Sequence, residues 1–593
     1  MKTKLQKFNQ YLTYIMALLY PIALFYLFES YTHNAFTTMK FPIQLLNYLF
    51  FELAALLLFF LIGRLHIAFI VESGLFAFIG LANYFVIQFR SAPIMPWDIF
   101  SIRTAASVAN NFKYNLSRNT VFTLLGFLLL IFIATGFRTL KVANWKKRLL
   151  GILICCMGIS GLTVYVQQPS TVSKFRMYDK LFTPTVMSKR DGTAIAFMME
   201  LQYLTVKKPS GYDEQTVIAT LDAQSQSAEA SNTAGNAAHR PNIIVIMNEA
   251  FSDLSILGDF KTNEDYMPFM HSLMDNGENT VSGHLNVSVL GGNTANTEFE
   301  FLTGNSMAFL PQGSIPYQQY ITQSIDSTPN YLKTLGYSTI GMHPYRAKGW
   351  DRERVYPLLG LDTSYFEDSF TDPLLIRKYI SDESNYKKIQ ELYEEKGANN
   401  PLFLFNVTMQ NHSSYTDSFP NFTPEIAMDG DSSDALNNYL SLIKISDSAL
   451  EDLIQYFKEQ SEDTIIVFFG DHQPANSVVE PIWKLQGKSN DTLTDEELNL
   501  RYKVPFIVWA NYDIPEESGV ETSANFLASR VLSIAGIPLS DYDSYLTNLQ
   551  QSYPVISAIQ ATDANGTSTP VADQSEQLNE YQQIQYYQIF KNR

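Results

Sequence analysis

Five apolar stretches near the start of the chain constrain its fold more than any other feature of the sequence. They cover residues 11–29, 43–63, 67–89, 120–137 and 149–166. Each is close to the roughly 20 residues that a helix needs to cross a bilayer. One such stretch could be a buried core helix, but five in succession predict a five-helix transmembrane domain over residues 1–168.

The placement of lysine and arginine predicts the orientation of these spans. Three lysines precede the first stretch, Arg64 separates the second from the third, and five basic residues lie at 138–148. This balance predicts a cytoplasmic N-terminus. Because the number of spans is odd, the C-terminal part is then extracellular, on a multi-pass protein of the cell membrane.

The remaining chain divides by composition. The expected parts are juxtamembrane helices and a flexible linker (169–240), a compact domain (241–554) and a polar C-terminal tail (555–593). Residues 223–238 are rich in Ser, Ala, Asn and Gln, which is typical of a flexible linker. Residues 558–577 are polar, so we expect disorder or loose packing there. Residues 99–114 are compatible with either a solvated connector or an interfacial helix.

Charge and cysteine content exclude some classes of protein. The net charge of −17 gives no support for nucleic-acid binding. The two cysteines, Cys155 and Cys156, are adjacent and lie in the fifth apolar stretch. The C-terminal part therefore has neither a disulfide nor a thiolate metal site.

Four short apolar runs in the C-terminal part, each followed by a polar residue, predict strands of one sheet. They cover residues 242–247, 337–342, 402–409 and 464–469. Continuous apolar runs that alternate with helical segments are typical of a sheet covered on both faces. In such sheets the functional site forms at the carboxyl edge of the strands.

The residues that follow these strands are metal-ligand types. Glu249, His343, His412 and the pair Asp471-His472 would meet at that edge. A single glutamate there is often only a neighbour of a helix cap, and a single histidine is often structural. Residues of these types after four different predicted strands, all at one edge of the sheet, favour a functional site. Carboxylate and imidazole ligands without thiolate suit Mn²⁺, Mg²⁺ or Zn²⁺ and do not decide among them.

Thr294 is the candidate nucleophile. It follows Gly291-Gly292-Asn293, whose glycines allow tight turns, and it would open a helix. A helix N-terminus favours an anionic oxygen and a bound phosphate. An alcohol needs a base or a metal to become nucleophilic at neutral pH, and Glu249, Asp471 and His472 could hold that metal. The alternative is that Thr294 is an ordinary helix cap.

A further polar group follows the strand that ends at His343. Trp350 and Arg352 lie a few residues on. Arginine pairs bidentately with phosphate oxygens, which suits a phosphate-binding role. Arg352 and Arg354 could equally be surface charges at the start of a helix.

At these residues the chain resembles the lipoteichoic acid synthase family, the polyglycerolphosphate synthases of Gram-positive bacteria within the alkaline-phosphatase/sulfatase superfamily. The motifs are NIIVIMNE, GNTANTEF, MHPYRAKGWDR, QNHSS and FFGDHQP, and they occur in the family's order. The resemblance covers nearly the whole chain. It implies an extracellular α/β/α sandwich of the alkaline-phosphatase/sulfatase type with a central, mostly parallel sheet.

The resemblance also implies a mechanism. Glu249, Thr294, Asp471 and His472 would hold one divalent ion, usually Mn²⁺. Thr294 would form a covalent glycerophospho-threonine intermediate, and the substrate pocket would comprise His343, Trp350, Arg352 and His412. The donor would be phosphatidylglycerol. The acceptor would be a glycolipid, a polyglycerolphosphate chain or a surface polysaccharide, because Asn293 and Asn296 stand where the family has a lysine and an acidic residue.

Other functions remain as alternatives. An arylsulfatase would need a Cys or Ser nucleophile in a C/S-x-P-x-R context, which the C-terminal part lacks. A phosphoethanolamine transferase shares the threonine and the membrane anchor, but the related members are rich in disulfides. A non-catalytic sensor or scaffold that binds a glycerophosphate polymer is the third alternative.

Overall fold

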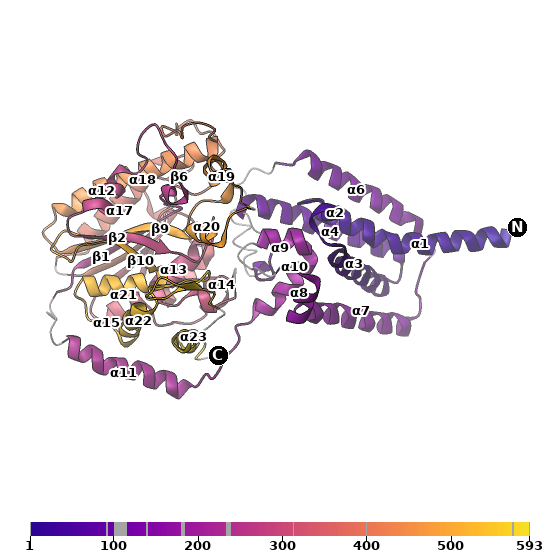
Figure 1. The fold of residues 1–593 in the computed structure, drawn as a ribbon, viewed down its shortest axis with the longest axis horizontal. Helices are drawn as coiled ribbons and strands as arrows, with labels where there is room; N and C mark the ends of the chain where they lie inside the picture. The colour runs from indigo at the N-terminus through magenta and orange to yellow at the C-terminus, as the bar shows by residue number, and fades with distance from the viewer. Residues whose placement is uncertain are drawn as a thin grey trace. The chain divides into compact units, whose positions relative to one another are not determined.

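A computed structural model describes the chain except for residues 1, 91–92, 100–114, 138–139, 179–183, 233–238, 312–313, 399, 491, 572–574 and 592–593. The chain forms two compact units (Figure 1). One holds the described residues up to Thr205, and the other holds those from Val206 onward. The stretch expected to be a connector or an interfacial helix, residues 99–114, lies almost entirely outside the described residues.

The first unit is all helical. Its elements are α1 (Lys2–Glu29), α2 (Ala35–Thr38), α3 (Phe41–Ile62), α4 (Leu65–Arg90), η1 (Pro96–Ile99), α6 (Arg118–Ala134), η3 (Thr135–Phe137), α7 (Trp145–Val166), α8 (Pro169–Phe175), α9 (Pro184–Asp191), α10 (Thr193–Glu200) and η4 (Leu201–Leu204). Aromatic packing joins them: the rings of Tyr20 on α1 and Phe69 on α4 stack with centroids 4.1 Å apart.

Four helices in the described residues are long and apolar enough to cross a membrane. They are Phe41–Ile62, Leu65–Gln88, Arg118–Phe137 and Trp145–Val166. These helices indicate a membrane-anchored protein and match four of the five predicted spans. The first predicted span falls within α1, whose apolar part, Tyr14–Glu29, is shorter. A fifth span therefore stays a prediction.

The second unit is built on an eight-stranded sheet in the order β10-β2-β9-β8-β1-β7-β3-β4. Its strands are β1 (Asn242–Asn248), β2 (Thr280–Asn286), β3 (Ser338–Met342), β4 (Thr363–Tyr365), β7 (Leu402–Val407), β8 (Thr464–Gly470), β9 (Lys503–Ala510) and β10 (Glu517–Ser523). The strands from β8 to β4 run parallel, whereas β9 is antiparallel to β8 and to β2. The four predicted strands are β1, β3, β7 and β8, and the mostly parallel sheet is confirmed.

Helices cover both faces of this sheet (Figure 1). The principal ones are α12 (Pro268–Asn276), α13 (Thr294–Thr303), α16 (Arg352–Leu358), α17 (Asp382–Glu395), α18 (Asp434–Lys458), α19 (Asn476–Leu485), α21 (Ala524–Ile534) and α22 (Asp541–Ser552). Side chains of β1 alternate between two cores. Val245 packs with the α13 and α21 side, and Ile244 with the α17 and α18 side. Burial on both faces explains why β1 reads as a continuous apolar run.

Two expectations from composition differ from the structure. Helix α11 (Glu214–Asn232) includes most of the stretch expected to be a flexible linker. The C-terminal tail forms a small sheet and helix α23 (Glu576–Phe590), which buries Leu578, Tyr581 and Ile584. These apolar residues recur every three positions between polar ones, so average polarity concealed a helix with one buried face.

Candidate metal and nucleophile site

The register of the central strands brings the candidate ligands together. Met247 of β1 lies beside Phe469 of β8 on one side and Val407 of β7 on the other. Because these parallel strands end at the same level, the residues that follow them emerge at one edge of the sheet. Glu249 follows β1, and Asp471-His472 follows β8.

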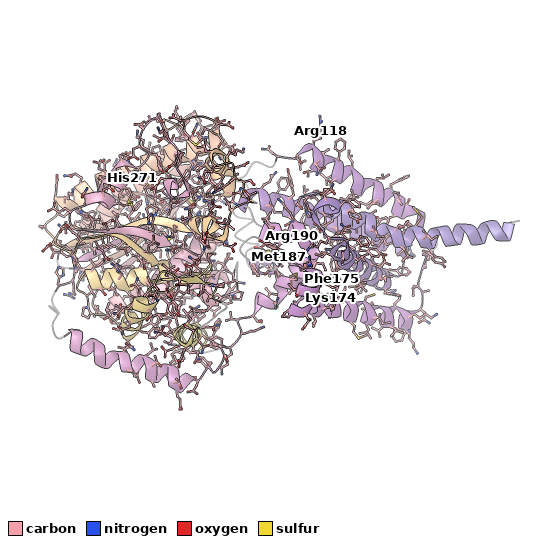
Figure 2. All side chains as sticks on the ribbon, in the orientation of Figure 1. Arg118, Lys174, Phe175, Met187, Arg190 and His271 are labelled. Atoms are coloured by element: carbon pink, nitrogen blue, oxygen red, sulfur yellow. The ribbon has the colours of Figure 1, made fainter. Side chains whose placement is uncertain are left out.

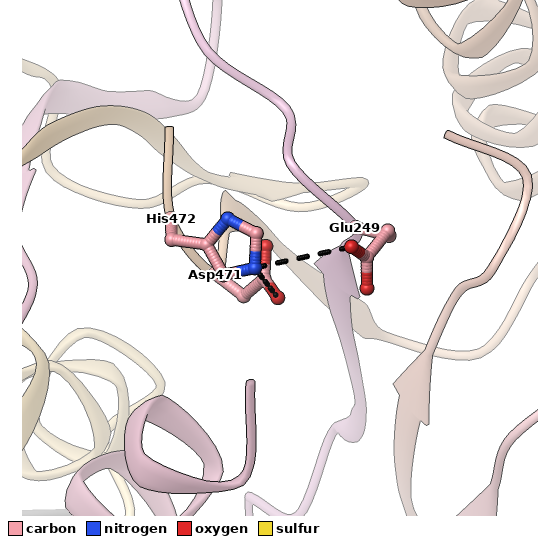
Figure 3. A group of neighbouring side chains, drawn as sticks. All are labelled: Glu249, Asp471 and His472. Carbon is pink, nitrogen blue, oxygen red and sulfur yellow. Dashed lines mark ion pairs between the residues drawn. The ribbon is translucent and has the colours of Figure 1, made fainter. Parts of the chain in front are cut away.

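Glu249, Asp471 and His472 form a buried group, in which one ligand atom from each lies within 4.8 Å of the others (Figure 3). Nε2 of His472 is 3.2 Å from Oδ2 of Asp471 and 3.8 Å from Oε1 of Glu249. Burial raises the pKa of Glu249 well above its usual value, and the nearby charge of Asp471 raises it further. Two buried carboxylates this close repel each other when both are ionised, and a bound cation between them would offset that repulsion.

The donor atoms of this group suit a divalent metal ion. Nδ1 of His472 donates to the carbonyl oxygen of Gln473 at 3.0 Å, so Nε2 carries the lone pair that faces the group. Oδ1 of Asp471 accepts from the backbone N–H of Ala250 at 2.7 Å. Each residue also has a second ligand atom, Oδ2 in Asp471 and Nε2 in His472. Both atoms are buried and have no hydrogen-bond partner within the described part of the chain. Orphaned buried ligand atoms of this kind fit a metal site.

Thr294 lies beside this group as the first residue of α13. Its hydroxyl is close enough to the Glu249 carboxylate to lower the pKa of that group, against the larger effect of burial. Gly291, Gly292 and Asn293 precede it with φ values of +67°, +151° and +65°, a backbone path that favours glycine. Because Asn293 occupies the cap position, Thr294 is not the cap that the alternative interpretation required.

Two hydrogen bonds fix α13 against the strand that supplies Asp471. The hydroxyl of Thr297, one turn into the helix, donates to the carbonyl oxygen of Asp471 at 2.8 Å. The N–H of Gly291 donates to the carbonyl oxygen of Gln473 at 3.0 Å. The helix N-terminus, with its partial positive charge, is thus held at the carboxylate group.

His343 and His412 extend the site along the sheet edge. His343 follows β3, is buried, and donates from Nδ1 to the carbonyl oxygen of Val407 at 2.9 Å. Burial, and then the charge of Arg352, hold its pKa well below the usual value, so the ring is neutral. His412 is half-buried, and burial lowers its pKa to about 4. Nδ1 of His412 lies 2.9 Å from the carbonyl oxygen of Ser413, which can only accept a hydrogen bond. In both neutral rings Nδ1 is therefore the donor and Nε2 the acceptor.

Arg352 is buried, which excludes the interpretation as a surface charge. Its guanidinium pairs with the carboxylate of Glu298, which is also buried. Trp350 is half-buried with φ +54° and packs against the core on the α13 side of the sheet. Arg354, by contrast, is exposed and pairs with Asp351.

Two residues near the site were not predicted from the sequence. Glu298 forms the ion pair with Arg352. It lies four residues after Thr294, and this spacing predicts that both side chains share one face of a helix. Arg377 donates to the carbonyl oxygens of Gln410, His412 and Ser414, and so fixes the loop that carries His412. Arg377 comes from a two-residue turn between short strands, and no sequence pattern marked it.

The sulfatase family matches residues 241–537 of the chain. The chain belongs to the sulfatase family. In this sulfatase-family domain, the matched segment contains all the strands, from β1 to β10, that form the large sheet. It also contains every site residue named above.

Relatives and a solved structure agree with this assignment. A putative cyclic beta-1,2-glucan modification protein of Rhizobium meliloti is 32% identical over 437 residues, which cover 71% of this chain and 65% of that protein. Lipoteichoic acid synthase of Staphylococcus saprophyticus is 26% identical over 309 residues, 50% of this chain and 46% of that protein. The matched regions thus span less than two thirds of either relative.

The solved structure of the phosphoglycerol transferase GacH of Streptococcus pyogenes, in complex with sn-glycerol-1-phosphate, has the same fold. The TM-score is 0.52 at 20% sequence identity, over 65% of this chain and 95% of that chain. At this identity the likeness shows the fold alone.

Proposed function

We propose that the protein is a membrane-anchored transferase that moves glycerol phosphate from phosphatidylglycerol to a cell-surface polymer. The observation that carries the proposal is the place of Thr294, at the first position of α13 and beside Glu249 of the carboxylate–histidine group. Relatives named for lipoteichoic acid synthesis and for glucan modification support a surface polymer as the acceptor.

The first step is an in-line displacement at phosphorus. Oγ1 of Thr294 forms a bond to phosphorus, the bond to the diacylglycerol oxygen breaks, and the threonine proton ends on diacylglycerol. Glu249, which lies beside Thr294, would orient the hydroxyl for attack on phosphorus. A bound divalent ion would supply charge neutralisation for the threonine oxygen and the phosphoryl group.

The second step reverses the first with a different alcohol. The acceptor hydroxyl oxygen forms a bond to phosphorus, the bond from phosphorus to Oγ1 of Thr294 breaks, and the acceptor proton ends on Oγ1 of Thr294. Arg352, Trp350 and the neutral rings of His343 and His412 would line the glycerol phosphate site, with the imidazole Nε2 atoms accepting hydrogen bonds from hydroxyl groups.

Glu249, Thr294, Asp471 and His472 are the proposed ligands of one divalent ion. Mn²⁺ is the first choice, with Mg²⁺ and Zn²⁺ as alternatives, because the donor set suits all three. We place the N-terminus in the cytoplasm and the catalytic unit outside. A Gram-positive source is not part of the proposal, since a relative comes from Rhizobium meliloti.

The test uses the full chain in detergent with fluorescent phosphatidylglycerol and Mn²⁺. We expect release of diacylglycerol by the wild type and none by Thr294→Ala. Thr303→Ala, a matched change at the other end of α13, should retain activity. Without acceptor, a glycerophosphoryl group should accumulate on the peptide that contains Thr294.

Two results would contradict the proposal. Release of diacylglycerol only from phosphatidylethanolamine would make the protein a phosphoethanolamine transferase. Metal binding without turnover of either lipid would favour a non-catalytic polymer-binding protein.

A further inference from the structure

A pocket lies in the helical unit, where α7 ends and the short helices α8, α9 and α10 follow. Its volume is about 470 Å³, within the range of roughly 300–1,000 Å³ typical of small-molecule sites. Val166, the last residue of α7, lines it. Since α7 is long and apolar enough to cross a membrane, the pocket lies where a spanning helix would leave the bilayer.

The pocket has an apolar interior with a polar side. Met177, Met187 and Met199 line it and are themselves buried, and methionine side chains adapt readily to flexible apolar ligands. Ser173 and Arg176 line it as well and are exposed to solvent. An apolar cavity with a cation at its solvent side suits an amphiphile with a negative head group.

The surroundings of the pocket are positively charged. Among the described residues from 166 to 205, the exposed ionisable side chains are Lys174, Arg176, Lys189 and Arg190. The acidic side chains of Asp191 and Glu200 are buried. Figure 2 shows Lys174 and Phe175 on α8 near Met187 and Arg190 on α9. The Lys174 ammonium lies 5.3 Å from the centroid of the Phe175 ring, a cation–π contact, and lysine side chains are favoured at membrane interfaces.

We propose that this pocket binds an anionic glycerophospholipid, with an acyl chain against the methionines and the phosphate beside Arg176 and Lys174. Basic residues near a membrane surface attract anionic lipids. After Val166, no helix in the described residues is both long and apolar enough to cross a membrane, and we therefore assign the pocket to the membrane side proposed for the catalytic unit. The inference rests on the proposed function in one respect, namely that the bound lipid is the donor.

The test uses the full chain in vesicles that contain phosphatidylglycerol with a photoreactive diazirine on one acyl chain. Labelled peptides are mapped, and diacylglycerol release is measured on the same samples. Arg176→Glu reverses the charge at the pocket and Met187→Trp fills it. The matched controls are Arg118→Glu, an exposed cation that Figure 2 shows apart from the Lys174–Arg190 group, and Met157→Trp, exposed on α7.

We expect labels within residues 166–202, reduced about tenfold by Arg176→Glu and by Met187→Trp and unchanged in both controls. Equal labelling by diazirine phosphatidylcholine would overturn the anionic preference, and labels confined to other segments would overturn the site. Diacylglycerol release that neither pocket variant slows would contradict the donor role alone. Pocket labels without any diacylglycerol release would support the lipid site and contradict the proposed transferase.

Discussion

The buried pair of Glu298 and Arg352 offers a direct test of how the site is supported. Nε of Arg352 lies 3.0 and 3.2 Å from the two oxygens of Glu298, and the hydroxyl of Tyr356 donates to the same carboxylate at 3.0 Å. The exposed fractions of the two charged side chains are 3% and 0%. Glu298→Gln keeps the size of the side chain and removes its charge, which leaves the buried guanidinium without its ion-pair partner.

The magnitude follows from the burial. Removing one member of a buried ion pair costs about 3–5 kcal/mol, and we expect about 3 kcal/mol because glutamine still accepts a hydrogen bond. Unfolding entropy near 2.1 cal/mol/K per residue gives about 0.8 kcal/mol/K for a unit of roughly 390 residues. The melting temperature should therefore fall by about 4 °C.

The assay is differential scanning fluorimetry of the full chain in detergent, with Arg352→Gln and the double variant measured in parallel. The double variant removes both charges of the pair, so its loss should be smaller than the sum of the single losses by about 2 kcal/mol. Diacylglycerol release should fall in every variant, since Arg352 is a proposed phosphate ligand. Additive losses, or a Glu298→Gln melting temperature equal to that of the wild type, would refute the reasoning.

Glu300→Gln is the matched control on the same helix. Glu300 is also buried, and it accepts hydrogen bonds from Ser288 and from the N–H of Met307, each at 2.8 Å. Burial raises its pKa to about 7, so near neutral pH it is only partly ionised. Replacing it by a neutral amide should therefore cost less than the same change at Glu298.

Three other predictions follow from particular contacts. Removal of the metal by a chelator should abolish turnover. It should also lower the melting temperature by about 3 °C, compared with protein in Mn²⁺ at about 100 times the Kd. In Asp471→Asn, scanning fluorimetry with and without Mn²⁺ should show no such difference. Hydrogen bonding to Asp253, and then to Asp265, raises the pKa of His271 (labelled in Figure 2) to about 9. Protonated His271 stabilises the fold fully below about pH 6.5, the pKa of histidine in the unfolded chain, and this stabilisation disappears as the pH rises through 9. The difference in melting temperature between the wild type and His271→Gln should therefore shrink from pH 6 to pH 10. Tyr581→Ala should destabilise the protein by about 3–5 kcal/mol in denaturant unfolding, because Tyr581 is fully buried and donates to the carbonyl oxygen of Gly304 at 2.6 Å; a loosely packed tail would give no change.

The central strands were predictable because the signal for them, a run of consecutive apolar residues, lies within each strand itself. A strand buried on both faces must be apolar at every position, and β1 and β8 show such runs directly. The polar residue that ends each run marks the edge of the sheet. Glu249, Asp471 and His472 were therefore predictable as neighbours without any knowledge of the strand order.

The partner of Arg352 and the packing of the tail depend on contacts between distant segments. Glu298 lies 54 positions from Arg352 in sequence; its spacing from Thr294 places it on the site-facing side of α13, but no local pattern shows that it pairs with Arg352. The tail has polar average composition, yet Tyr581 and Ile584 on one face of α23 complete a core with Phe526 and Leu546. Composition averages over the faces of a helix, whereas packing uses only one of them.

Gly470 shows how the backbone fixes the distance between the proposed ligands. It is the last residue of β8, and a Cβ atom there would lie 1.9 Å from the carbonyl oxygen of Phe251. The segment that follows β1 therefore crosses directly over the end of β8, and only glycine permits this approach. The crossing allows the N–H of Ala250 to reach Oδ1 of Asp471 and places Glu249 opposite His472. A larger residue would separate these two segments, so the spacing of the carboxylate–histidine group is set by the absence of a side chain at Gly470 as much as by the ligands themselves.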